Sequence, residues 1–169
     1  MTMPSLTPNW SRPIPAVSWP WPDPNRKTAP TTIPVMLDEG ATLPARQTSG
    51  AAGFDLTARR WMILPPHGTA LVPTGVHIAI PAKHHADVRG RSGLAARGYW
   101  CHVGLIDSDY RGELGVILHN LTDEPHEIHA GDRIGQLVFP ALADVHLVQV
   151  GALDQTERGT GAFGSTGRA

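Results

Sequence analysis

The sequence predicts an all-β fold, and three observations lead to this prediction. Apolar runs of strand length, rich in Val, Ile and Leu, follow one another from Ile33 onward. The 18 glycines and 16 prolines supply turn positions between many of these runs. No window keeps a helical period of apolar residues over three turns. Many short strands separated by turn residues indicate a sandwich, a barrel or a jelly roll within residues 33–152.

The expected strands are short segments that are rich in β-branched residues or leucine. In chain order they are 34–38, 62–68, 69–80, 115–120, 132–139 and 144–150. Apolar and polar residues partly alternate in 76–80 and 146–150, as they do in a half-buried strand. Residues 92–98 could form a single helical turn.

Residues 1–32 differ in composition from the rest of the chain. They hold eight prolines interleaved with three tryptophans. Because proline lacks a backbone donor and fixes φ, we expect an extended, largely disordered N-terminal arm rather than a central strand or a helix. Its tryptophans could dock on the domain itself or on a partner whose identity the sequence does not give.

Overall composition excludes several classes of function. A formal net charge of −1 and a pI near 6.7 provide no basic field, so we expect no nucleic-acid partner. The chain has no apolar segment of membrane-spanning length and no secretory signal, so we expect no membrane contact. Cys101 is the single cysteine, which rules out an intramolecular disulfide and fits a cytoplasmic protein. We expect it to be a small core residue rather than a nucleophile.

Residues 104–120 combine two apolar runs with a polar segment between them. The pattern predicts a hairpin whose turn contains Asp107 and Tyr110 and ends near Gly112. Asp107 follows the first apolar run directly, where a carboxylate is costly unless it is paired or used. A carboxylate at such a strand end can orient a water molecule and accept its proton, so Asp107 is a candidate general base.

Two further stretches carry groups that suit phosphate or a cation. In residues 90–98, Arg91 offers a bidentate fork, Ser92 a hydroxyl group and Gly93 an unobstructed backbone N–H, a set that suits a polyphosphate. Asp55 is a hard oxygen ligand in a strand-like run, suited to Mg²⁺ or to its bound waters.

Residues 131–139 form a candidate strand with polar positions. Alternation along it would place Asp132, Ile134 and Gln136 on one face, with the carboxylate near the amide.

The C-terminal residues contain Gly159, Gly161 and Gly164 at the spacing of a dinucleotide-binding loop. That loop requires a preceding strand and a following helix, and too few residues remain after Gly164. The alternative is a flexible Gly/Ser tail, but Arg158 and Phe163 are unusual in a segment that serves only solubility.

Taken in chain order, these five stretches resemble the five motifs of the trimeric deoxyuridine triphosphatases, also called dUTP diphosphatases or dUTPases. The stretches are 51–58, 90–98, 104–120, 131–139 and 158–167. The resemblance implies a distorted β jelly roll assembled as a homotrimer with shared active sites, and a C-terminal lid formed by residues 153–169. It also implies an enzyme that hydrolyses dUTP to dUMP and pyrophosphate with Mg²⁺, by attack of water on the α-phosphorus. That reaction keeps uracil out of DNA and supplies dUMP for thymidylate synthesis.

The resemblance also implies roles for individual residues. Asp107 would activate the water, and Tyr110 would pack under deoxyribose and exclude a 2′-hydroxyl. Uracil would be read by backbone groups of Gly104, Leu105, Ile106 and Gly115. The phosphates would be held by Arg91, Ser92, Gly93 and Gln136. Asp55 would order waters around a Mg²⁺ held mainly by the substrate. The lid residues that would close over the nucleotide are Arg158, Phe163, Gly164, Ser165 and Thr166.

Four positions depart from the family pattern. Gly90 replaces a proline, Gly135 an alanine and Ala162 a glycine, while Cys101 stands where some members have asparagine. None of these changes removes a charged or catalytic group.

Two other functions stay open on the sequence alone. A deoxycytidine triphosphate deaminase can share this fold, but such relatives resemble the chain less in residues 104–120 and lack its tail motif. A nucleotide-sensing regulatory protein could keep the pocket and act through the N-terminal arm, although the intact Asp107, Arg158 and Phe163 favour retained chemistry.

Overall fold

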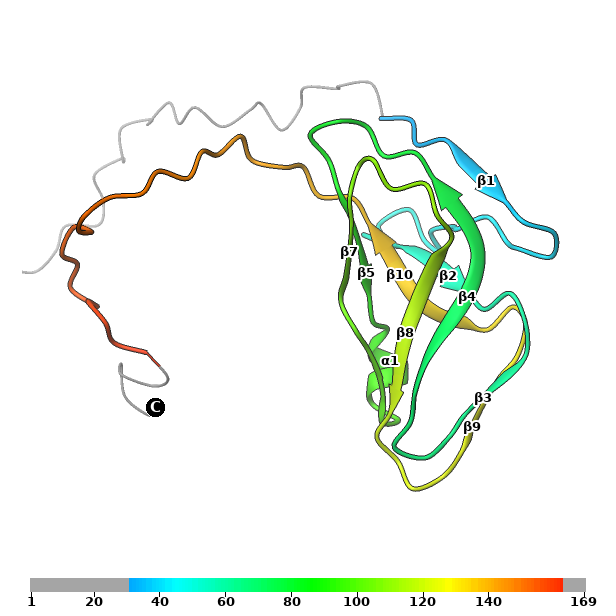
Figure 1. Ribbon diagram of the computed structural model, residues 1–169. Coiled ribbons are helices and arrows are strands. Elements are labelled where there is room, and N and C mark those ends of the chain that lie inside the picture. Colours follow the sequence, from blue (N-terminus) through cyan, green and yellow to red (C-terminus); the bar gives the residue numbers. More distant parts are fainter. Residues whose placement is uncertain (1–30, 163–169) are drawn as a thin grey trace, which may run out of the picture. The chain divides into compact units, whose positions relative to one another are not determined.

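Two four-stranded β-sheets and a two-stranded ribbon form the computed structural model, which describes residues 31–162 (Figure 1). The first sheet has the order β1–β4–β8–β6, with strands Val35–Leu37, Thr69–Ile78, Leu114–Asn120 and Tyr99–Cys101. The second has the order β2–β10–β5–β7, with strands Phe54–Thr57, Arg133–Val138, Ala86–Arg89 and Gly104–Ile106. The ribbon pairs β3 (Met62–Leu64) with β9 (His126–Ile128).

All these pairings are antiparallel, and a single helical turn, α1 (Ser92–Ala95), follows β5. The predicted all-β fold and the single turn near residue 92 are thus confirmed. Among residues 31–162, no helix is long and apolar enough to cross a lipid bilayer.

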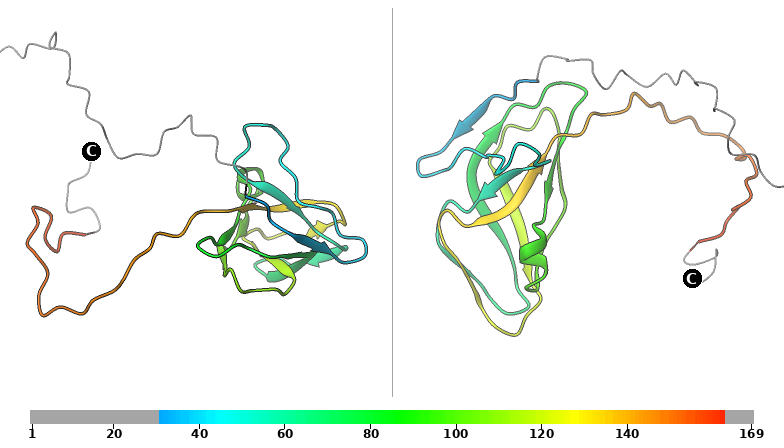
Figure 2. Two further views of the ribbon diagram at one scale, coloured as in Figure 1. Left: turned by 90° about the horizontal axis from the view of Figure 1, so that it is seen from above. Right: turned by 180° about the vertical axis from the view of Figure 1, so that it is seen from behind.

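The two four-stranded sheets enclose one shared apolar core and form two layers (Figures 1 and 2). Val72, Val116 and Leu118 enter it from the first sheet, and Leu56 and Leu137 from the second; none is more than 1% exposed. Because side chains alternate along a strand, the residues between these core positions point to the outer face of each sheet. The polar residues considered below lie on those outer faces or in the loops between strands.

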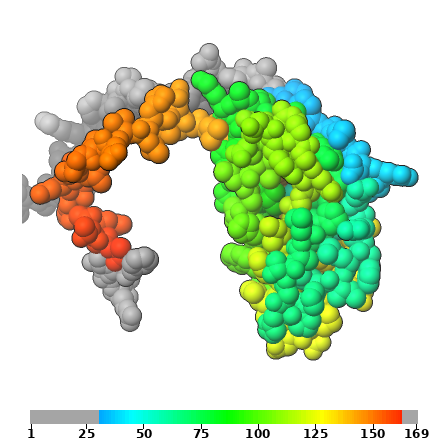
Figure 3. Space-filling view, in the orientation of Figure 1, coloured from blue at the N-terminus to red at the C-terminus, as the bar shows by residue number. Residues whose placement is uncertain are grey.

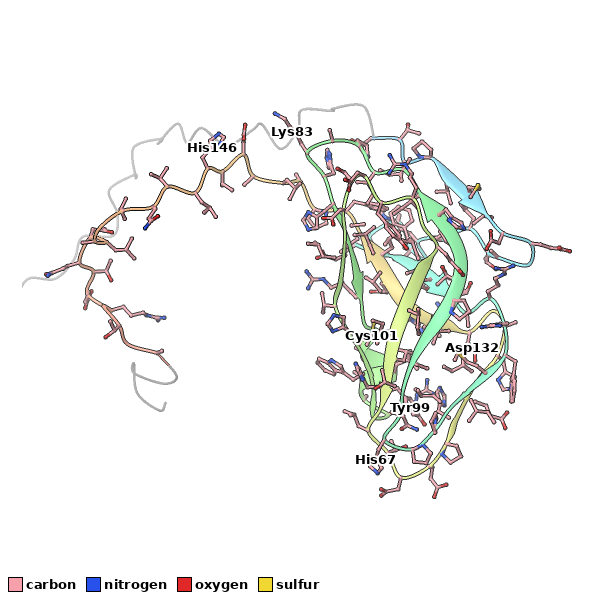
Figure 4. The ribbon with its side chains drawn as sticks, in the orientation of Figure 1. His67, Lys83, Tyr99, Cys101, Asp132 and His146 are labelled. Carbon is pink, nitrogen blue, oxygen red and sulfur yellow. The ribbon has the colours of Figure 1, made fainter. Side chains whose placement is uncertain are left out.

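The predicted strand at 144–150 is wrong. No residue of this segment belongs to a strand, and Leu147 is 99% exposed. His146 marks this segment in Figure 4. A strand needs a partner for its backbone groups, and no described strand pairs with this segment, despite its alternating apolar residues.

The predicted hairpin over 104–120 is also wrong in its pairing. The two apolar runs are the strands β7 and β8, but β7 pairs with β5 in one sheet and β8 with β4 and β6 in the other. The polar segment between them therefore passes from one sheet to the other instead of closing a two-stranded ribbon.

The predicted alignment of Asp132, Ile134 and Gln136 on one face does not hold. The register of β10 shifts between Arg133 and Gly135, and such a bulge reverses the alternation locally. Ile134 is buried in the core, Gln136 points to the outer face, and the Asp132 carboxylate accepts a hydrogen bond from the His129 backbone N–H at 2.8 Å.

The boundaries of the three predicted segments, 1–32, 33–152 and 153–169, stay predictions. Residues 1–30 and 163–169 lie outside the described part of the chain.

Candidate functional site

A cavity of about 490 Å³ is lined by β7, at one edge of the second sheet, and by residues of β4 and β8, the two central strands of the first sheet. Six of the residues predicted to contact the base, the sugar or the reacting water line it. They are Gly104, Leu105, Ile106, Asp107, Tyr110 and Gly115. The resemblance assigned these residues to one site and they line one cavity, but the strands that carry them do not pair with each other as the predicted hairpin requires.

The edge position of β7 gives the cavity its backbone groups. Among the described strands, β7 pairs with β5 alone, so one edge of Gly104–Ile106 has no strand partner. Unpaired N–H and C=O groups at such an edge can hydrogen-bond a ligand as they would a neighbouring strand. Gly115 is on β8, and an added Cβ there would collide with the end of the Leu71 side chain. Glycine therefore leaves room for the Leu71 side chain, which also lines the cavity.

The loop after β7 presents Asp107 and Tyr110. The Tyr110 backbone N–H donates to the Asp107 carbonyl at 3.2 Å, which closes the turn, and Arg111 donates to the Tyr110 carbonyl at 2.7 Å. In the space-filling view the light-green residues that follow β7 lie on the surface of the face shown (Figure 3). Asp107 is exposed, so the burial cost inferred from the sequence does not apply within one chain. Its carboxylate is accessible to solvent and to a substrate.

Gly112 explains how Tyr110 is held. The Tyr110 hydroxyl donates to the Glu113 carbonyl at 3.1 Å, and the ring lies over Gly112. A Cβ at position 112 would collide with the ring and its hydroxyl oxygen. Tyr110 is 44% exposed and forms one wall of the cavity.

A second group of predicted residues surrounds Asp55 on β2. Asp55 is 6% exposed. Its Oδ1 accepts from Gln136 Nε2 at 3.3 Å and lies 3.5 Å from Arg91 Nε. Its Oδ2 accepts from Arg133 Nη1 at 3.1 Å. One carboxylate thus joins side chains from β2, β10 and the residue before α1.

The backbone around α1 fixes Arg91, Ser92 and Gly93. Arg91 has extended backbone angles and precedes the turn, and its Nη1 donates to the Arg133 carbonyl at 2.9 Å. Nothing lies within 4 Å of where a Cβ of Gly93 would be, so its surroundings are open. The set combines a guanidinium, a hydroxyl group and open backbone, as the sequence suggested.

The two groups of residues stay apart within one chain. None of Asp55, Arg91, Ser92 and Gln136 lines the cavity that holds Asp107. Arg158 is exposed, in a segment where Gly159 N–H donates to the Thr156 carbonyl at 3.0 Å and Gly161 N–H to the Arg158 carbonyl at 3.0 Å. Four predicted lid residues lie outside the described part of the chain, where Figure 1 draws a grey trace: Phe163, Gly164, Ser165 and Thr166.

Several lining residues were not anticipated. The cavity is also lined by Arg60, Leu71, Pro73, Glu113 and Ile117. Arg133, which belongs to the group around Asp55, was also missed. Strict alternation along β10 would place Arg133 and Gln136 on opposite faces of the strand. The bulge in β10 brings Arg133 to Asp55 instead, and this bulge has no clear sequence signal. Glu113 directly follows the turn that was predicted to end near Gly112, so its position in the sequence could have identified it as a lining residue of the cavity.

Two departures from the family pattern lie against each other. A Cβ on Gly90 would come within 3.2 Å of Cys101 Cβ. Cys101 lies within the domain on β6 (Figure 4), does not line the cavity and is 5% exposed. Burial raises the pKa of its thiol to about 11, so the thiol stays protonated at neutral pH. The prediction of a core cysteine is confirmed.

The match to known proteins is extensive. The family model described as dUTPase matches residues 39–167. The deoxyuridine 5′-triphosphate nucleotidohydrolase of Beijerinckia indica is 50% identical, covering 76% of this chain and 85% of that protein. That of Wolinella succinogenes is 46% identical, covering 79% of this chain and 91% of that protein.

Solved structures agree with the sequence relatives. A mutant dUTPase of Staphylococcus bacteriophage 80alpha with dUpNHpp superposes with a TM-score of 0.77 at 27% identity, covering 82% of this chain and 100% of that one. A mutant dUTPase from phage phi11, described as revealing the coordination of a structural Mg(II) ion, has a TM-score of 0.68 at 25% identity and covers 72% of this chain and 98% of that one. The expected jelly-roll fold is thereby confirmed.

Proposed function

The chain belongs to the dUTPase family, and on this basis we propose that it hydrolyses dUTP to dUMP and pyrophosphate by attack of water on the α-phosphorus. The observation that supports this most is the cavity beside the edge of β7. It places unpaired backbone groups, an aromatic ring and an accessible carboxylate in one small space.

Each wall of the cavity has a task in this reaction. A fixed row of backbone N–H and C=O groups on Gly104–Ile106 suits the imide of uracil and mismatches the amino group of cytosine. The ring of Tyr110 would stack against deoxyribose and leave no room for a 2′-hydroxyl. Asp107 would orient the water molecule and accept its proton as the water oxygen attacks the α-phosphorus.

The Asp55 group is suited to the triphosphate. Arg91 offers two parallel N–H donors, Ser92 its hydroxyl group and Gln136 its amide. Positive groups placed in advance around the phosphate oxygens stabilise the charge that develops there in the transition state. Asp55 keeps Arg91 and Gln136 beside each other through its Oδ1.

The described residues do not form a magnesium site of their own. They contain no group of three or more His, Cys, Asp or Glu side chains placed to hold a metal ion. Both oxygens of Asp55 already have partners. The resemblance implies that Mg²⁺ is bound mainly by the substrate, where it would neutralise phosphate charge. The role of Asp55 in ordering its waters stays a prediction, and the contacts of Asp55 favour positioning instead.

The resemblance implies a homotrimer, and the separation of the two groups supports sites that are shared between copies of the chain. Within one chain, Asp107 and the Asp55 group do not line the same cavity, so a second copy of the chain would supply the phosphate-binding residues. Mixing two inactive variants, Asp107→Asn and Arg91→Ala, tests this sharing. Recovery of activity after joint refolding is expected because some mixed sites then hold both native residues. If the mixture stays inactive although mixed oligomers form, each site belongs to one chain.

The C-terminal residues would act as a lid on the bound nucleotide. Arg158 would contact phosphate and Phe163 would stack on the base, a contact worth about 1–3 kcal/mol. Removing residues 153–169 should abolish turnover and leave the oligomer intact, as light scattering would show. Unchanged turnover would refute the lid.

The activity itself is tested by release of pyrophosphate, with Mg²⁺, from dUTP, dCTP, dTTP and UTP in parallel. Fast release from dUTP alone is expected. Release of ammonia from dCTP would favour a deaminase, and binding of dUTP without release would favour a regulatory protein.

A cytoplasmic location and a partner for residues 1–32 stay predictions. A Dictyostelium discoideum relative that is 42% identical is named a mitochondrial protein, so a cytoplasmic location is not shared by every relative.

A further inference from the structure

Arg89 lies beside the proposed phosphate-binding residues, on the neighbouring strand. It ends β5, and its register partner on β10 is Gln136, whose own partner on β2 is Asp55. Residues directly opposite each other in an antiparallel pair project to the same face, with Cβ atoms about 4.5–5.5 Å apart. Asp55, Gln136 and Arg89 thus form one row across three strands. Because Leu137 and Val88 in the next row are buried in the core, this row faces outward.

A buried carboxylate holds Arg89 in place. Asp87 is two residues earlier on the same face of β5 and is 6% exposed. Its Oδ2 accepts from Arg89 Nη2 at 2.6 Å and Nε at 3.1 Å, while its Oδ1 lies 3.2 Å from His85 Nε2. A carboxylate fixed from two sides anchors one edge of the guanidinium, which reduces the freedom the side chain loses on binding a ligand.

The opposite edge of the guanidinium is available. No described residue accepts a hydrogen bond from Arg89 Nη1, and the side chain is 54% exposed. Asp87 therefore orients Arg89 without using all of its donors. Gln136, its neighbour in the row, directs its amide to Asp55.

The charge of this face also favours an anion. The arginines at 89, 91 and 133 outnumber the aspartates at 55 and 87, so the face has a surplus of positive charge. Without Arg89 the remaining formal charges would cancel. A triphosphate has several negative oxygens, and a planar guanidinium can bind two of them at once.

We propose that Arg89 is a further phosphate-binding residue, held ready by Asp87 and His85, that contacts the triphosphate chain next to Gln136. The proposal rests on the proposed function, since it concerns the same substrate. It assigns a binding role to a strand residue outside the five motif stretches.

The test compares Arg89→Gln with a matched control, Arg59→Gln. Arg59 also forms an ion pair with a nearby aspartate, with Arg59 Nη1 2.7 Å from Asp38 Oδ2, and belongs to neither group of site residues. Loss of a charged contact to phosphate should raise the KM for dUTP about tenfold and leave kcat within about twofold. The inhibition constant of pyrophosphate should rise by a similar factor. Arg59→Gln should change neither constant.

Two further measurements keep the outcome decisive. Because Arg89→Gln leaves Asp87 with His85 alone, the double variant Asp87→Asn/Arg89→Gln removes the unpaired charge and should keep the raised KM with a native melting temperature. Wild-type KM in both variants would overturn the proposal and leave the proposed function standing. If the wild-type chain does not hydrolyse dUTP, the proposed function fails. Calorimetry with pyrophosphate still tests Arg89 in that case, and equal affinity of wild type and Arg89→Gln for pyrophosphate would overturn the phosphate-binding role of Arg89.

Discussion

Replacing Asp55 with asparagine removes the shared acceptor of three side chains without changing the volume of the residue. The amide keeps one acceptor oxygen, but its NH₂ group then faces a guanidinium or the amide of Gln136, which are also donors. Losing a charged hydrogen-bond partner costs about 1.5–3 kcal/mol. Arg133 and Arg91 are 45% and 26% exposed and can turn to water, which places the expected loss near the lower end, at about 2 kcal/mol.

Thermal unfolding measures this loss directly. For a chain of this size, about 2 kcal/mol corresponds to a fall of roughly 4–8 °C in the melting temperature. Asp38→Asn is a suitable control because Asp38 is 32% exposed and pairs with Arg59, and it should cost less. Since Arg91 and Gln136 lose their common anchor, the KM for dUTP should also rise, while the Mg²⁺ concentration for half-maximal rate should stay unchanged. An unaltered melting temperature together with a raised Mg²⁺ requirement would refute positioning and favour the metal role.

Two other predictions follow from the local geometry. Gly112→Ala should displace the Tyr110 ring and lower kcat/KM for dUTP by about tenfold or more. The control is Gly50→Ala, whose added Cβ meets nothing within 4 Å. Equal kcat/KM values for the two variants would contradict the packing argument. Burial raises the pKa of Cys101 from 9.0 to about 11, so the thiol ionises at lower pH in the unfolded chain than in the folded one. The contribution of the buried thiol to the free energy of unfolding is therefore full below pH 9 and is lost as pH approaches 11. Urea unfolding should therefore show wild type losing stability relative to Cys101→Ala over this range, and a constant difference would contradict the burial effect.

The residues of the cavity could be predicted in part because they lie close together in the chain. The local pattern placed Asp107 and Tyr110 in a loop between two short strands, and the resemblance to a family added Gly104 and Gly115. Their pairing was not readable, because the choice of β5 as the partner of β7 depends on packing between distant segments.

The Asp55 group shows the opposite case. Asp55, Arg91 and Gln136 are far apart in the chain, and only the resemblance to a family joined them before the structure did. The contact of Arg133 with Asp55 could not be predicted from the sequence, because a bulge in β10 reverses the expected alternation. Residues 144–150 were misread for a related reason: an alternating pattern predicts a strand wherever it occurs, but a strand forms only where a partner edge exists.

The catalytic assignment depends on Asp107, and the direct measurement is kcat for dUTP hydrolysis by Asp107→Asn beside Asp109→Asn. Both aspartates lie in the loop after β7 and both are exposed, but only Asp107 lines the cavity. Loss of a general base should lower kcat by about 10²–10⁴-fold in Asp107→Asn. Asp109→Asn should stay near the wild-type rate. Near-wild-type turnover by Asp107→Asn would show that another group activates the water.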